Sequence, residues 1–207
     1  MRTKSMTTST LLFGTLAVAT AAACAAPPTS EIDSATTAIE MAMTAEATTY
    51  APEAFQTAQA AQEALASELA MQESRFALMR SYDRATELAV EAKTAAEDAQ
   101  QAATAEKERV RLETTQLLAD ARTSLEETKA LLENAPSGKG TQADIAAMKA
   151  DLTVVETSLA EADSALAASD LSNAKAKVQA ALNATIKVKT AVEQAQAMRA
   201  AGTRGRS

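Results

Sequence analysis

The segment from Asp83 to Asn134 contains neither Gly nor Pro, and it constrains the fold of the whole chain. Its residues are mostly Ala, Leu, Glu, Gln, Lys and Arg, which are strong helix formers. As one unbroken helix it would be roughly 78 Å long at ~1.5 Å per residue. A helix buries its apolar stripe only against another element, so further helices must pack along it. The sequence therefore predicts an all-α, elongated antiparallel bundle organised around this helix.

Small and apolar residues recur along this segment at intervals of eleven. The two rows are Leu88, Ala99, Val110, Ala121, Leu132 and Ala92, Ala103, Thr114, Leu125. Eleven residues over three turns give ~3.67 residues per turn, close to the period of a straight helix. The charged run from Glu106 to Arg111 is interpreted as a solvated region where one set of packing partners ends and another begins. A hinge there would instead fold the helix back into a compact bundle.

Shorter helices are predicted on both sides of the long one. A first helix reaches about Thr48, and a second runs from Pro52 to Met79. The predicted divisions are a first helical segment at 31–134 that includes the long helix, a loop at 135–140, a second helical hairpin at 141–201 and a disordered tail at 202–207. Short loops make neighbouring helices antiparallel. We therefore expect two three-helix segments that share the long helix, a spectrin-like plan in geometry.

The shorter helices carry apolar residues at alternating steps of three and four, which is coiled-coil spacing. In the second helix the seam is Phe55, Ala58, Gln62, Leu65, Leu69, Gln72, Phe76 and Met79. In the hairpin the two seams are Ile145, Met148, Leu152, Val155, Leu159, Ala162, Leu166 and Leu171, Ala174, Val178, Ala181, Thr185, Val188, Val192, Ala195. The aromatic residues expected to fill the bundle ends are Tyr50, Phe55, Phe76 and Tyr82.

Residues 1–23 have the organisation of a secretory signal peptide. Arg2 and Lys4 precede an apolar stretch, Leu11–Ala23, that is too short to cross a bilayer. The stretch ends in Ala21-Ala22-Ala23-Cys24, which resembles the lipobox of bacterial lipoproteins. That resemblance implies that Cys24, the only cysteine of the chain, becomes the lipidated first residue of the mature protein and carries fatty acids such as palmitate.

Residues 24–30 follow as a tether, in which Pro27 and Pro28 favour an extended backbone. Ala25 follows the cysteine, in place of the Asp that retains many lipoproteins in the inner membrane. The resemblance therefore implies the periplasmic face of the outer membrane. The alternative is ordinary signal-peptide cleavage after Ala-x-Ala, which would release a soluble periplasmic protein.

Composition argues against several classes of function. The formal net charge is −7, whereas a nucleic-acid partner would require a basic surface. The chain contains no His, which is the commonest metal ligand and the commonest general base. Paired carboxylates such as Glu126 and Glu127 are interpreted as solvated surface, and the scattered Met residues as packing or surface residues. We therefore predict no catalytic, cofactor-binding or metal-binding residues and no enzymatic activity.

The loop at Ser137–Ala143 resembles the phosphate-binding loop of adenylate kinases. Such a loop needs a Gly five residues before its Gly-Lys pair and a buried strand leading into it. Glu133 stands at that position, and its carboxylate would repel phosphate. The sequence therefore predicts a helix-breaking loop and no nucleotide binding at Lys139.

Tyr50-Ala51-Pro52-Glu53-Ala54-Phe55 and Ser81-Tyr82-Asp83-Arg84-Ala85 resemble an Ala-rich family of bacterial envelope lipoproteins, classed as a domain of unknown function. The resemblance covers roughly Ser30 to Ala105, and it implies a lipobox and an antiparallel helix pair. It adds no catalytic residues. We predict a non-enzymatic structural or tethering lipoprotein, bound to the membrane through Cys24, with a possible envelope-protein or cell-wall partner. The alternative is a periplasmic module that binds an amphiphile, which excess volume beside Phe55 or Phe76 would favour.

Overall fold

The computed structural model describes residues 26–135 and 142–204. Within these ranges the chain forms six α-helices, one short 3-10 helix and no β-strand. The elements in chain order are α1 (Thr29–Thr44), α2 (Ala47–Tyr50), α3 (Pro52–Ser74), η1 (Ala77–Met79), α4 (Asp83–Glu133), α5 (Gln142–Ala167) and α6 (Leu171–Arg204). The all-α prediction is confirmed.

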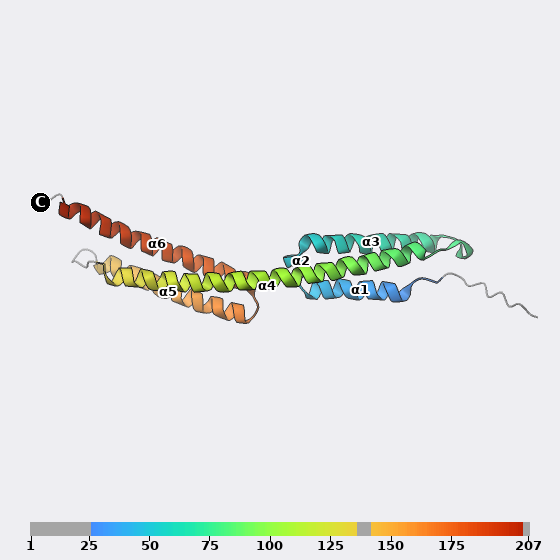
Figure 1. The fold of residues 1–207 in the computed structure, drawn as a ribbon, viewed down its shortest axis with the longest axis horizontal. Helices are drawn as coiled ribbons and strands as arrows, with labels where there is room; N and C mark the ends of the chain where they lie inside the picture. Colours follow the sequence, from blue (N-terminus) through green and yellow to red (C-terminus); the bar gives the residue numbers. More distant parts are fainter. Residues whose placement is uncertain (1–25, 136–141, 205–207) are drawn as a thin grey trace, which may run out of the picture.

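Helix α4 is continuous over 51 residues and runs through most of the length of the molecule (Figure 1). At ~1.5 Å per residue its axis is about 76 Å long. Its buried residues include all members of the two predicted rows except Val110, which is half-buried. The eleven-residue spacing therefore predicted both the continuity of α4 and the face that contacts the other helices.

The remaining helices form two groups at opposite ends of α4 (Figure 1). Helices α1, α2 and α3 pack on its first half, whereas α5 and α6 pack on its second half. Helices α3 and α5 run antiparallel to α4, and α1 and α6 run in the same direction as α4. The protein is thus an elongated rod of two three-helix segments that share α4, as the sequence predicts.

The core of the first segment is built largely from alanine. Six alanines of α4 are fully buried against α1 and α3: Ala85, Ala89, Ala92, Ala96, Ala99 and Ala103. Side chains this small let neighbouring helices approach closely. Larger side chains fill the two ends, where Phe55 packs near the middle of the rod and Tyr82 packs at its outer end. Two of the four aromatic predictions are therefore confirmed, and Tyr50 is half-buried.

The core of the second segment uses larger aliphatic residues. Its cluster includes Leu118, Leu125 and Leu132 of α4, Leu152, Val155 and Leu159 of α5, and Val178, Val188 and Val192 of α6. Buried threonines interrupt these seams without leaving a hydroxyl unsatisfied, because each donates to a carbonyl one turn earlier, as Thr185 does to Ala181 at 2.9 Å. The predicted seams of both hairpin helices are confirmed apart from Ala195, which is exposed.

The first predicted helix is broken before its expected end near Thr48. Helix α1 ends at Thr44, and Glu46 adopts a left-handed conformation with φ 60° and ψ 35° before α2 begins. The backbone N–H of Glu46 donates to the carbonyl of Met43 at 2.9 Å. A left-handed conformation costs an L-residue about 1–2 kcal/mol. Here it turns the chain so that Ala47 becomes fully buried and α2 contacts both α3 and α4.

The second predicted helix also ends early, and its last seam residues were assigned wrongly. Helix α3 ends at Ser74, and the chain reaches α4 through an extended turn and η1. Phe76 and Met79 are both 73% exposed, so neither fills the end of the bundle. The side chain of Arg80, in the turn that follows, donates to the carbonyls of Glu73 and Arg75 at the end of α3 and stabilises this early end.

The boundaries near the chain ends differ slightly from the prediction. Helix α1 already begins at Thr29, within the predicted tether. Helix α6 continues to Arg204, so residues 202–204 are helical, although the sequence predicted a disordered tail there. The signal peptide, Cys24 and nearly all of the predicted loop at 135–140 lie outside the described residues.

Candidate functional site at the waist of the rod

The waist is residues 106–113 of α4, where the first segment ends and the second begins. The last buried α4 residue of the first segment is Ala103, and the next buried residue along α4 is Thr114. Between them α4 presents a dense run of charged side chains. The structure therefore confirms the interpretation of Glu106–Arg111 as a partly solvated boundary between two sets of packing partners.

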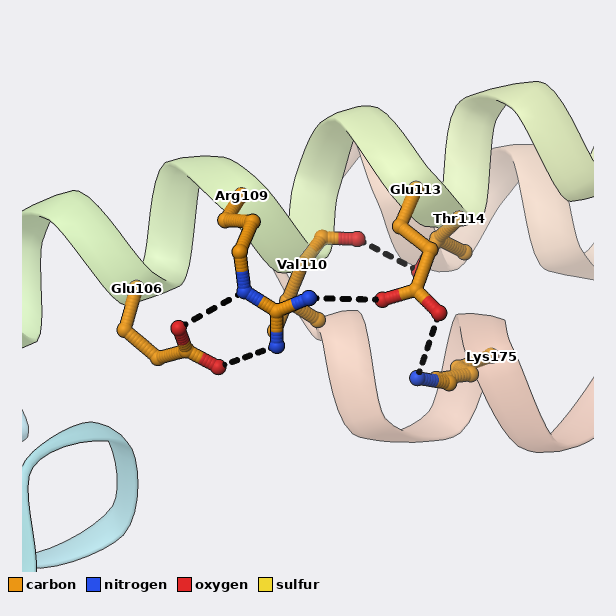
Figure 2. A network of polar contacts seen from close by, with 6 residues as sticks. All are labelled: Glu106, Arg109, Val110, Glu113, Thr114 and Lys175. Carbon is orange, nitrogen blue, oxygen red and sulfur yellow. Dashed lines mark hydrogen bonds and ion pairs between the residues drawn. The ribbon is translucent and has the colours of Figure 1, made fainter.

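Four charged side chains form a row of ion pairs across the waist (Figure 2). The Nε and Nη2 atoms of Arg109 donate to the two carboxylate oxygens of Glu106 at 2.8 and 2.6 Å. Its Nη1 atom lies 3.4 Å from Oε2 of Glu113. The other oxygen of Glu113 lies 3.4 Å from Nζ of Lys175, near the start of α6. The row thus connects the middle of α4 to the second segment.

The ion pairs shift the proton affinities of the groups at the waist. The hydrogen bonds from Arg109 lower the pKa of Glu106, and those from Arg111 lower the pKa of Glu108. The same contacts raise the pKa of both guanidinium groups. Both acids are therefore ionised at neutral pH, and their charges are matched by neighbouring cations.

A second ion pair connects the waist to the first segment. The Nζ atom of Lys107 lies 2.5 Å from Oε1 of Glu46, the left-handed residue between α1 and α2. The same ammonium group lies over the ring of Tyr50, 5.6 Å from its centroid, in a cation–π arrangement. Lys107 and Lys175 therefore connect α4 to the inner ends of both segments.

A shallow groove of about 370 Å³ opens between α2, α4 and α6 at the waist. Its lining includes Tyr50 of α2, Glu106 and Val110 of α4, and Leu171 and Lys175 of α6. The groove thus combines an aromatic ring and small apolar areas with one acidic and one basic group.

The residues weighed from the sequence as candidates for lipidation, nucleotide binding or acid–base chemistry do not line this groove or lie outside the described residues. Cys24 and Lys139 belong to the latter group. Glu126 and Glu127 are exposed, as predicted, and they pair with Lys129 at 2.8 Å and Lys189 at 3.3 Å. Neither of these two glutamates lies at the waist.

Lys129 also pairs with Glu156 of α5, and its hydrogen bonds to both carboxylates raise its pKa. Arg122 of α4 pairs with Asp163 of α5 in a similar way. These contacts are exposed and each contributes little by itself. They form a row of cross-helix pairs along the second segment, which helps to fix the register of α5 on α4.

Metal sites and membrane spans are both absent from the part of the chain that the structure describes. In residues 26–135 and 142–204 we find no group of three or more His, Cys, Asp or Glu side chains that could hold a metal ion. None of the helices formed by these residues has the length and apolar character needed to cross a bilayer.

The chain matches no known protein-family model, and no curated protein or solved structure is significantly similar to it. The resemblance of the Tyr50–Phe55 and Ser81–Ala85 segments to envelope lipoproteins therefore stays a prediction.

Sequence reasoning missed two features of the surface. The first is the contact of Lys107 with Glu46 and Tyr50, because it joins residues about 60 positions apart. The second is the exposed apolar turn between α3 and α4. A local signal for that turn existed, since Arg75 and Arg80 flank Phe76-Ala77-Leu78-Met79 and place two charges close to an otherwise apolar run.

Proposed function

We propose that the protein is a non-enzymatic, lipid-anchored rod of the bacterial cell envelope. In this proposal Cys24 carries the lipid, and the mature chain extends from the outer membrane into the periplasm. The observation that carries the proposal is the position of α1 (Thr29–Thr44), which begins toward one end of an elongated molecule (Figure 1).

The tether is short compared with the rod. From Cys24 to Thr29 there are five residue steps, which span at most about 18 Å when fully extended. Helix α4 alone is about 76 Å long. An anchor at Cys24 would therefore hold the first segment close to the bilayer, while the second segment could reach several nanometres away from it.

The proposed role is that of a tether or spacer that presents the waist and the second segment to a partner. The partner would be an envelope protein or the cell wall. The ion pairs at the waist support this role, because Lys107 and Lys175 connect α4 to both segments and oppose bending there. A rigid spacer keeps a defined distance between its ends, which a flexible linker does not.

The packing beside Phe55 does not favour the alternative of an amphiphile-binding module. Phe55 is 4% exposed, and its neighbours Ala42, Ala47, Ala99 and Ala103 are fully buried around it. An amphiphile would need an apolar cavity of a few hundred Å³ there. We therefore retain the tethering role as the proposal.

The first experiment tests the anchor in cells of a bacterial host. Wild-type protein should appear in the outer-membrane fraction, and intact mass measurement should find acyl chains on a chain that begins at Cys24. Cys24→Ser should lose the acyl mass and should not be processed at that site. Wild-type protein that is soluble after cleavage before Cys24, without acyl mass, would contradict the proposed anchor.

The second experiment tests the spacer role on vesicles that contain the lipidated protein. A donor dye is placed at Glu87 or at Glu127 through single cysteine substitutions, and the acceptor is a dye-labelled lipid. The two sites are about 60 Å apart along α4 at ~1.5 Å per residue. We expect strong energy transfer from position 87 and weak transfer from position 127. Equal transfer from both sites would mean that the rod lies flat, and it would contradict the spacer role.

A further inference from the structure

The turn between α3 and α4 exposes three large apolar side chains at the outer end of the rod. Phe76, Leu78 and Met79 are 73%, 75% and 73% exposed, and Ala77 between them is exposed as well. We call residues 75–80 the apolar tip. Single exposed apolar residues are common on protein surfaces, whereas several adjacent ones are a feature of interaction sites.

The apolar tip has a defined conformation rather than a frayed one. Arg80 donates to the carbonyl of Glu73 at 2.9 Å and to that of Arg75 at 3.1 Å. The backbone N–H of Met79 donates to the carbonyl of Phe76 at 2.8 Å, which closes η1. These contacts hold the apolar side chains outward, so their exposure is part of the fold.

The charges of the tip have the opposite sign to those of the whole chain. Residues 75–80 contain Arg75 and Arg80 and no acidic residue, whereas the chain has a formal net charge of −7. Among the described residues, neither arginine forms an ion pair with a carboxylate, and Glu73 and Asp83 are the nearest acidic residues along the sequence. An apolar group bordered by two guanidinium groups suits the surface of an anionic bilayer, where side chains enter the acyl boundary and cations meet phosphates.

The position of the tip relative to the beginning of α1 also supports a membrane surface as its partner. The tip and the beginning of α1 lie toward the same end of the rod: the tip is at the extreme end, where α3 joins α4, and α1 begins alongside α4 nearby (Figure 1). A lipid on Cys24, at most about 18 Å of extended chain from Thr29, would bring that end to the membrane. The tip would then face the bilayer surface while the waist and the second segment face away from it.

We propose that the apolar tip is a second membrane contact, in which Phe76, Leu78 and Met79 insert into the interface of a bilayer containing anionic phospholipids. Arg75 and Arg80 lie at the level of the headgroup phosphates. The orientation of the rod in this proposal rests on the proposed anchor at Cys24, whereas the affinity of the tip for lipid does not. Two contacts, one at the end of α4 and one through the tether before α1, define the tilt of the rod, which a single flexible tether cannot do.

The test uses tryptophan as a probe, because the chain contains none. Full-length protein with Phe76→Trp is purified from membranes, its acyl mass is measured, and it is reconstituted into vesicles of phosphatidylethanolamine and phosphatidylglycerol. The matched control is Val154→Trp, at a 65% exposed apolar position on α5. Vesicles with brominated acyl chains quench only those tryptophans that enter the bilayer.

We expect Phe76→Trp to emit at shorter wavelength in vesicles than in detergent-free buffer and to lose more than half of its emission to the brominated lipid. Val154→Trp should keep the emission of a water-exposed indole. Replacing Arg75 with Gln in the Phe76→Trp background, or omitting phosphatidylglycerol, should reduce the quenching several-fold. Arg75 is chosen because its side chain does not cap α3, so the variant keeps its fold, which circular dichroism verifies.

The outcomes separate the tip from the anchor. An acylated Phe76→Trp protein whose emission remains unquenched would refute the membrane contact and leave the anchor intact. Quenching of a protein without acyl mass would refute the anchor and support the tip. Emission that is already shifted to shorter wavelength without vesicles, together with a dimer in solution, would mean that a second copy covers the tip, and it would also refute the proposal.

Discussion

The side-chain carbonyl of Gln72 accepts a hydrogen bond from the backbone N–H of Ser81 at 3.1 Å, across the turn between α3 and α4. Gln72 is 4% exposed, and its amide also donates to Glu68 at 2.6 Å. The buried side chain of Gln72 thus has both its acceptor and its donor satisfied, and it pairs a backbone N–H just before α4 begins. This side chain therefore fixes the start of α4 relative to the end of α3.

Replacing Gln72 with Leu should destabilise the first segment by about 1–2 kcal/mol. The substitution keeps the volume but removes the acceptor for Ser81 and the donor for Glu68, and unmade bonds at buried positions cost about that much. The measurement is urea unfolding followed by circular dichroism. Gln59→Leu, at an exposed position of the same helix, is the control and should change stability by less than about 0.5 kcal/mol. Equal effects of the two substitutions would contradict the role of Gln72.

Leu159→Ala should destabilise the second segment by about 2–5 kcal/mol. Leu159 is buried between α4 and α6, and truncation of a buried leucine removes apolar contacts and leaves a cavity. Val154→Ala on the same helix should cost less than about 0.5 kcal/mol, because that side chain is exposed. Thermal unfolding of the three proteins at one pH and one salt concentration provides the comparison. A small effect at Leu159 would mean that α5 does not pack as described.

The waist should lose its ion pairs on acidification. The pKa of Glu106 in the folded protein lies below its ordinary value of 4.5, mainly because Arg109 donates hydrogen bonds to the carboxylate. Because the pKa is lowered, the stabilisation from the Glu106–Arg109 contact is complete above about pH 4.5. It disappears as the pH falls through the pKa that Glu106 has in the folded protein. Glu106→Gln should therefore lower Tm slightly at pH 7 and have no effect near pH 2.

The control for the acid experiment is salt. The waist is exposed to solvent, so 1 M salt, where the screening length is about 3 Å, should remove most of the difference between wild type and Glu106→Gln at pH 7. A Tm difference that persists at low pH and at high salt would show that Glu106 acts through packing and not through its charge.

The regular parts of the rod could be predicted from sequence because their signals are local and repeated. The residues of the two rows, Leu88 to Leu132 and Ala92 to Leu125, recur at intervals of eleven and therefore lie on the same face of one helix. Each further member of a row adds evidence for the same buried face. The same holds for the seam of α5 around Leu152 and Leu159, where consecutive steps of three and four define one buried face.

The ends of the helices were not predicted, because side-chain contacts across the turns decide them and the apolar spacing does not encode these contacts. The seam spacing of α3 continues through Phe76 and Met79, but α3 ends before it reaches them, where the Arg80 side chain donates to the carbonyl of Glu73 and Gln72 accepts from Ser81. The break at Glu46 likewise depends on contacts of α2 with α3 and α4 that no local pattern encodes.

The candidate site was predicted only in part. The charged run on α4 marked the waist, because it interrupts the apolar rows. The groove itself was missed, since Tyr50, Val110 and Lys175 come from three helices whose relative placement follows from the complete fold.

Helix α4 should stay straight through the waist in solution. Spin labels at Glu87 and Glu127, both exposed, report on this, because the 40 residue steps between them span roughly 60 Å in a continuous helix at ~1.5 Å per residue. We expect a single distance distribution centred near 60 Å, because Lys107 and Lys175 connect α4 to the inner ends of both segments. A labelled pair within the second segment, at Gln116 and Glu127, is the control and should give about 17 Å in either case. A maximum near 20–30 Å for the long pair would show that α4 folds back at the waist, and the protein would then be a compact bundle that cannot act as a spacer.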